Sequence, residues 1–206
     1  MGMGQMSDRI QPLDAIGPVS GSGQDGDEAL NDPAKADYKA GREYLGKKDY
    51  VQAAACFHNA LRGFEEQGND HGMANAHDRL GDICLEREEF GKALDHYQCA
   101  FEICRKESDI FSLVALNKKK ALAYRKMGEL NLAMVVMMDI LDHYTETRNP
   151  KGSVEILEMI AEVYKEKGDN LKAADALRTI AGIHRNFGHR RTAEDFDKRA
   201  LEAEQE

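Results

Sequence analysis

Apolar residues recur along most of the chain at intervals of three and four, the spacing of one face of an α-helix. From Ala34 onward, short polar or glycine-containing segments interrupt these stretches about every twenty residues, near residues 49, 69, 89, 109, 129, 149, 169 and 189. The stretches between them are long enough for about four helical turns each. The pattern therefore predicts an all-α fold of about nine helices.

The residues at the interruptions suit the ends of helices. Ser108 and Asp109 are natural N-caps, and Pro150 is suited to the first turn of a helix. Glycine is preferred where a helix ends in a left-handed residue, because it has no Cβ to clash. Four glycines lie on the twenty-residue grid just before the turns: Gly68, Gly128, Gly168 and Gly188.

Successive helices alternate in kind, so the true repeat is a pair of helices of about forty residues. Two features recur in every pair. The first helix has a small residue, and the second helix has an alanine followed four positions later by a larger residue. Small residues at a crossing let two helices approach closely, and the larger residue fills the space beside them. The aligned positions are Gly41, Gly81, Ala121 and Ala161; Ala53, Ala93, Ala133 and Ala173; and Phe57, Tyr97, Met137 and Leu177.

One helix pair cannot bury its apolar face alone, so the pairs must stack into an array that is stable only collectively. We expect one repeat domain over residues 34–206, preceded by a flexible acidic tail over residues 1–33. The expected pairs cover residues 34–68, 74–108, 114–148 and 154–188. A final amphipathic helix over residues 190–205 is expected to cap the last apolar face.

The second pair carries His77-x2-Leu80-Gly81-x2-Cys84, followed by Ala93-x3-Tyr97. This skeleton resembles the tetratricopeptide repeat family from Ala34 to the C-terminus, in a long-helix variant with a forty-residue repeat. The resemblance implies a right-handed α-solenoid of antiparallel helix pairs. The third pair departs most from the family pattern, because Lys120 occupies the position of the consensus leucine.

The net charge of −9 is unevenly distributed, because residues 1–33 hold six carboxylates against one arginine, a balance of −5. An acidic chain without a basic tract argues against nucleic acid as a partner. No apolar run approaches the ~20 residues of a membrane span, so we expect no membrane interaction. The first residues do not show the pattern of a secretory signal, and the cysteines form no closely spaced pair, so the sequence predicts a cytoplasmic protein.

No motif for catalysis, phosphate binding or metal binding occurs in the sequence. The seven histidines are scattered, and the four cysteines lie within helical patterns, where buried free thiols are expected. The sequence therefore predicts no enzymatic activity, no cofactor and no metal site.

The resemblance implies that the first helices of successive pairs line a concave groove. Its lining would be mixed to basic over three pairs and acidic over the fourth, which suits an extended, largely acidic peptide held by arginine and lysine. The alternative is that these residues form ordinary solvated helix faces. The expected partner-binding residues are Tyr38, Arg42, Asn75, Arg79, Asp82, Lys118, Lys119, Leu122, Arg125, Glu155 and Glu158.

The second helix of the third pair is apolar on every side, with Val135, Val136 and Met138 where the second pair has polar residues. Either this pair packs more deeply than its neighbours, or it exposes an apolar patch for a partner or a second copy. The tail also has a short apolar segment from Ile10 to Val19. Charge complementarity suggests that this segment occupies the partly basic groove.

The sequence thus predicts a non-catalytic adaptor that binds a protein or peptide in its concave groove. One alternative is a scaffold that self-associates, as a homodimer for example, through the apolar face of the third pair. Another is a regulatory subunit of an enzyme or a response regulator.

Overall fold

Nine α-helices and no strand are found in residues 32–205, the part of the chain that this computed structural model describes. The seven central helices have 17 residues each, and the first and last have 14. The helices are α2 (Pro33–Gly46), α3 (Tyr50–Glu66), α4 (Asp70–Glu86), α5 (Phe90–Lys106), α6 (Ile110–Lys126), α7 (Leu130–Glu146), α8 (Pro150–Glu166), α9 (Asn170–Asn186) and α10 (Arg190–Ala203).

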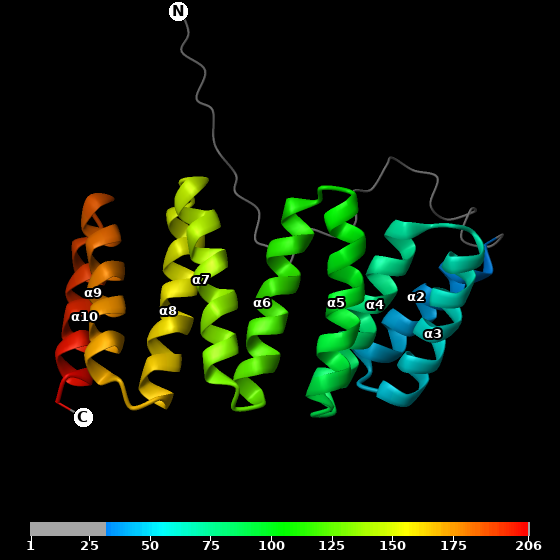
Figure 1. Ribbon diagram of the computed structural model, residues 1–206, viewed down its shortest axis with the longest axis horizontal. Coiled ribbons are helices and arrows are strands. Elements are labelled where there is room, and N and C mark those ends of the chain that lie inside the picture. The colour runs from blue at the N-terminus through cyan, green and yellow to red at the C-terminus, as the bar shows by residue number, and fades with distance from the viewer. Residues whose placement is uncertain (1–31, 206) are drawn as a thin grey trace, which may run out of the picture.

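Helices that are neighbours in the sequence are neighbours in space, so the molecule extends from α2 at one end to α10 at the other (Figure 1). Successive helices run in opposite directions, which places every turn at one of two edges. The predicted all-α solenoid of stacked helix pairs is confirmed. The predicted tail, apart from Asp32 and Pro33, lies outside the described residues.

The turns are built alike. Each has one residue with a positive φ, which glycine adopts most easily. The predicted glycines have φ of 64° to 80°, but the other four turns place a non-glycine residue in this conformation. Ser108 is one of these at φ 58°, so it is not the N-cap of α6; Asp109 is, and its side chain accepts a hydrogen bond from the Ser112 backbone N–H. The other left-handed residues are Lys48, Glu88 and Arg148.

Close approach of the two helices in a pair depends on the small residues of the first helix. A Cβ added at Gly81 would lie 2.4 Å from the Tyr97 ring, and one added at Gly41 would lie 2.9 Å from the Phe57 ring. The third and fourth pairs have alanine at these positions and pair it with the slimmer aliphatic side chains Met137 and Leu177, all of them buried. The combined side-chain volume at the helix crossing is therefore kept similar in every pair: glycine faces an aromatic ring, and alanine faces a slimmer side chain.

Lys120 interrupts the core. Its equivalents Leu80 and Ile160 are 1% and 3% exposed, whereas Lys120 is half-buried and extends its ammonium group outward to Gln98 Oε1 on α5, at 2.7 Å. The Nζ atom also lies 4.8 Å from the centroid of the Phe101 ring. Burial lowers the pKa of Lys120. No described helix has both the length and the apolarity of a membrane-spanning segment.

Candidate partner-binding faces

The first helices of the pairs form one layer. Ion pairs join α4 to α6, α6 to α8, and α8 to the capping helix α10. We call the exposed side of α2, α4, α6, α8 and α10 the first-helix face. We call the exposed side of α3, α5, α7 and α9 the second-helix face.

Lys119 is held between two carboxylates of the preceding pair. Its Nζ lies 2.6 Å from Asp78 Oδ1 and 2.7 Å from Asp82 Oδ1. Asp82 also accepts hydrogen bonds from Arg79 at 3.1 Å and from the Tyr97 hydroxyl at 3.0 Å. Burial raises the pKa of Asp78, although Lys119 opposes the shift. Burial also raises the pKa of the Tyr97 phenol, which the Asp82 charge reinforces. The predicted residues Arg79, Asp82 and Lys119 are therefore brought together.

The same arrangement recurs between α6 and α8. Lys118 Nζ lies 2.7 Å from Glu155 Oε2. Arg125 contacts Glu162 at 2.8 Å and Glu166 at 2.6 Å. Hydrogen bonding to Glu166 raises the pKa of Arg125 against the opposing effect of burial. The basic helix α6 thus lies between carboxylates from both neighbouring first helices.

These pairings follow a rule of sequence separation. The partners are 37 or 41 residues apart, on either side of the forty-residue repeat. Two positions four apart on a helix lie on the same face, one turn apart. A cation on one first helix therefore meets two carboxylates on its neighbour, as Lys119 and Arg125 do. One such carboxylate, Glu166, is absent from the predicted site, because the forty-residue period does not show that a cation reaches residues 37 and 41 positions away.

The pairing changes the charge that a ligand would meet. The side chains of Lys118, Lys119 and Arg125 are only 18%, 28% and 23% exposed. Their partners on α8 are more accessible, with Glu155 at 47% and Glu162 at 56%. The exposed charge of the α8 part of the face is therefore acidic. Four of the cations expected to bind an acidic peptide are already paired with carboxylates of the chain itself: Arg79, Lys118, Lys119 and Arg125.

The remaining predicted residues are dispersed over the face. Tyr38 is half-buried, with its ring centroid 5.3 Å from that of Phe57, and Arg42 is exposed. Asn75 Nδ2 lies 3.1 Å from His71 Nδ1, Leu122 is half-buried, and Glu158 pairs with Arg199 at 3.4 Å. A hollow of about 320 Å³ opens beside Arg125 and Arg199. The face thus combines paired charges with one depression near α10.

The second predicted interface is partly changed by the structure. Val135 and Met138 are 59% and 43% exposed on α7, as a docking surface requires. Val136 is half-buried and packs against the core, so it does not belong to this surface. Leu132, 47% exposed, takes its place. We call Leu132, Val135 and Met138 the α7 stripe.

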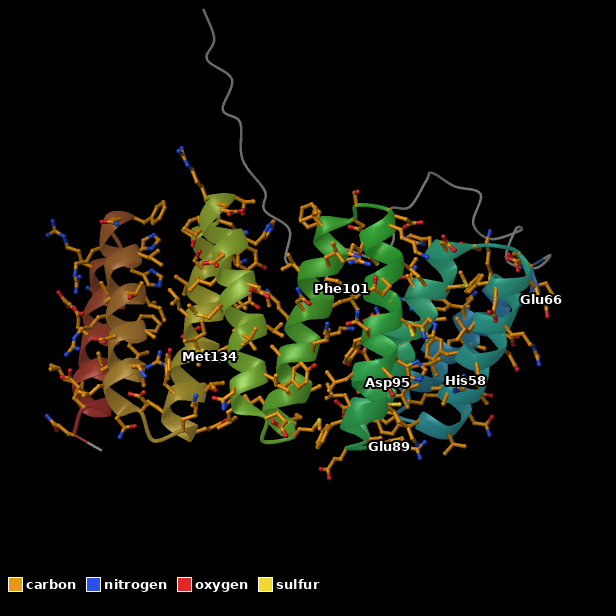
Figure 2. All side chains as sticks on the ribbon, in the orientation of Figure 1. His58, Glu66, Glu89, Asp95, Phe101 and Met134 are labelled. Atoms are coloured by element: carbon orange, nitrogen blue, oxygen red, sulfur yellow. The ribbon has the colours of Figure 1, made fainter. Side chains whose placement is uncertain are left out.

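Three of the seven histidines lie close together, contrary to the expectation that they are scattered. His77 Nδ1 is 3.1 Å from His96 Nδ1, and the His58 ring centroid is 6.1 Å from that of His96. Figure 2 labels His58 on α3 and Asp95, the residue before His96, on α5. Burial lowers the pKa of His96 to about 4, helped by His77 and His58, and burial also lowers the pKa of His77. The sequence signal was their regular interval of nineteen residues, one less than the helix period.

The described residues contain no group of three or more His, Cys, Asp or Glu side chains arranged to hold a metal ion. The cysteines are free thiols, with Cys104 buried, Cys56 and Cys84 half-buried, and Cys99 exposed. The expectation that all four are buried is therefore wrong for Cys99, which lies on the outer side of α5.

Comparison with known proteins agrees with this architecture. Residues 32–106 match the family model described as tetratricopeptide repeat. A search of curated proteins finds no match. Similar solved structures include a putative kinesin light chain from Podosopora anserina with nearly identical TPR-like repeats, at a TM-score of 0.68 and 15% identity over 84% of this chain and 88% of that one.

Two further structures share the fold. BtubC (BKLC) from P. vanneervenii has a TM-score of 0.61 and 12% identity, covering 87% of this chain and 85% of that chain. The Rap conjugation gene regulator of plasmid pLS20, in complex with the Phr* peptide, has a TM-score of 0.60 and 17% identity, covering 94% and 59%. The chain therefore matches the tetratricopeptide repeat model over residues 32–106, and as a whole it shares the fold of TPR-like solved structures, with helix pairs that repeat about every forty residues.

Proposed function

We propose that the chain is a non-catalytic interaction module that binds a segment of a partner protein across its first-helix face. The observation that carries this proposal is the series of ion pairs linking α4, α6, α8 and α10. These contacts hold side chains from separate repeats in fixed positions before any ligand arrives. A surface whose side chains are already ordered loses less conformational entropy when a segment binds to it.

The proposed segment is one with basic side chains opposite α8. The exposed groups there are Glu155, Glu158, Glu162 and Glu166, each 41% to 56% exposed. An acidic ligand would have to displace these carboxylates from Lys118 and Arg125. Removing one partner from such a pair leaves the other charge poorly solvated, which disfavours exchange. The acidic peptide expected from the sequence alone is therefore the less favourable ligand.

Peptide binding has a precedent in the fold, since the plasmid regulator that resembles this chain was solved with the Phr* peptide. The likeness is one of fold, and it supports only the general suitability of stacked helix pairs for holding a peptide. The residues proposed to contact the ligand come from this chain alone.

A position-specific cross-linking experiment tests the proposal. A photo-reactive amino acid is placed at Arg42 or Leu122 on the first-helix face, and at Asp175 on the second-helix face as the matched control. In the native cell, both first-helix positions are expected to capture the same partner and Asp175 to capture none. Glu162→Lys should reduce that capture. Capture from Asp175 alone would assign binding to the opposite face.

The α7 stripe supports a second candidate, self-association. Antiparallel packing of two stripes about a twofold axis would set Leu132 against Met138 of a second copy, with the two Val135 side chains meeting at the axis. Val135→Lys should abolish any dimer seen by sedimentation equilibrium. The control Val51→Lys, at a site 69% exposed on α3, should leave it intact. A wild-type monomer at every concentration would reject this candidate.

A further inference from the structure

A second hollow, of about 410 Å³, opens at the edge where α7 ends, α8 begins and α9 ends. We call it the edge hollow. Its apolar lining comes from Leu141, Tyr144, Leu157, Ile183 and Phe187. Phe187 is 59% exposed, which is unusual for a large aromatic side chain without a covering group. The edge hollow therefore presents apolar surface to water.

The apolar lining is particular to this part of the array. One repeat earlier, Ile183 and Phe187 are replaced by the polar residues His143 and Thr147. Apolar side chains that line an open hollow are removed from water when an apolar segment packs over them, which favours binding there. The difference between repeats therefore points to an occupant for the edge hollow that the other pairs do not require.

The turns around the edge hollow are positively charged. Arg148 lines the hollow, and Lys151 follows it in the first turn of α8. Arg190 and Arg191 begin α10, directly after the turn that ends α9. All four are exposed, and Glu146 is the exposed carboxylate that ends α7. The balance of charge at this rim favours an acidic apolar segment.

We propose that residues 10–19 of the same chain bind in the edge hollow. The segment contains Ile10, Leu13, Ile16 and Val19 at intervals of three, with Asp14 among them. It belongs to a stretch whose net charge is −5 over residues 1–33. Its apolar residues match the lining, and the charge of Asp14 matches the positive rim. The first-helix face is a poorer site for it because the cations of α6, Lys118, Lys119 and Arg125, are already paired.

The chain is long enough for this contact within one molecule. Helices alternate in direction, so α2 begins at the same edge as α8, the edge of the hollow (Figure 1). Packed helices lie about 10 Å apart, so α8 lies at least about 30 Å from α2 along the first-helix layer. The connection from Val19 to Asp32 can span at most about 45 Å. Tethering also gives the segment a local concentration near the millimolar range, which favours it over a second copy.

Competition binding tests the proposal with full-length chains. The probe is a fluorescent peptide of residues 8–20, and its affinity is measured by anisotropy. In the double variant Leu13→Asp/Ile16→Asp, the chain's own segment can no longer compete. This variant is expected to bind the probe about tenfold more tightly than wild type. Adding Phe187→Asp to it should abolish binding.

The matched control adds Phe111→Asp instead, because Phe111 is 84% exposed at the same edge and does not line the hollow. It should leave probe binding unchanged. Equal affinity of wild type and the double variant, or binding indifferent to Phe187→Asp, would overturn the proposal. Hydrogen exchange of residues 183–187 should be slower in wild type than in the double variant at every protein concentration. Protection that grows with concentration would mean binding to a second copy and would also overturn it.

Discussion

The second pair, α4 and α5, and the third pair, α6 and α7, share one backbone plan but distribute polarity in opposite ways. In the second pair, Leu80 fills the core, and Lys92, Asp95 and Gln98 are exposed on the outer helix. In the third pair, Lys120 occupies the core position, and the α7 stripe is exposed.

This contrast shows which positions the fold depends on. The turns and the small residues at the helix crossing are kept in both pairs, while a core leucine and an outer polar face are not. Lys120 is tolerated because its aliphatic chain lies in the core while its ammonium group reaches Gln98. Apolar and polar residues can therefore replace one another at equivalent positions of different repeats while the backbone stays the same. The exposed α7 stripe is one result.

Leu80→Lys should have the largest effect, because it transfers the third-pair residue into the second pair. Leu80 is 1% exposed, and a charge buried there without a partner should cost more than about 3 kcal/mol of unfolding free energy. Urea denaturation measures the change. A cost below that of an ordinary surface substitution would show that the second pair can accommodate lysine as the third does.

Gly81→Ala should come next. The added Cβ would lie 2.4 Å from the ring of Tyr97, which is fully buried and hydrogen-bonded to Asp82. Overpacking of this kind should destabilise the protein by about 2 kcal/mol in the same assay. The control is Gly182→Ala, where no atom lies within 4 Å of the new Cβ. It should stabilise the protein by about 0.5 to 1 kcal/mol through helix propensity.

Acidification should weaken the second pair selectively, since the third pair has Asn117 and Val136 where the second has His77 and His96. Folding lowers the pKa of His96 to about 4, so the unfolded chain binds the proton more readily. The stability that neutral His96 contributes to the folded protein is complete above pH ~6.5 and is lost as the pH falls towards 4. Since the ring is half-exposed, we expect a loss of about 1 to 2 kcal/mol.

Thermal denaturation of wild type and His96→Gln at pH 7 and pH 4.5 isolates this effect from the titration of carboxylates. The variant should lose less stability than wild type on acidification. Parallel losses in the two proteins would show that the histidine contact makes no contribution.

Lys120→Leu should have the smallest effect and the opposite sign. Replacing a half-buried cation with the residue of the second pair removes a desolvation cost, although it gives up the contacts with Gln98 and Phe101. We expect a gain of about 1 kcal/mol. Loss of stability would instead make the lysine a structural element of the third pair.

Much of the fold could be predicted because its determinants are local and repeated. The helix count, the glycine turns and the small residues at the crossings all follow from periodicity. The candidate site could be predicted only in part. The structure brings the predicted residues Arg79, Asp82 and Lys119 together, but the sequence does not indicate their mutual pairing, nor that Glu162 and Glu166 pair with α6.

The sequence by itself therefore determined the repeat unit, its period and the positions of the small residues at the helix crossings. Only the tertiary structure decided that Leu132, and not Val136, shares an exposed face with Val135, and that His77 meets His96. Those contacts depend on how each helix is rotated against its neighbours, which packing geometry sets. A period along the chain specifies which residues recur, but the rotation between pairs specifies which of them meet.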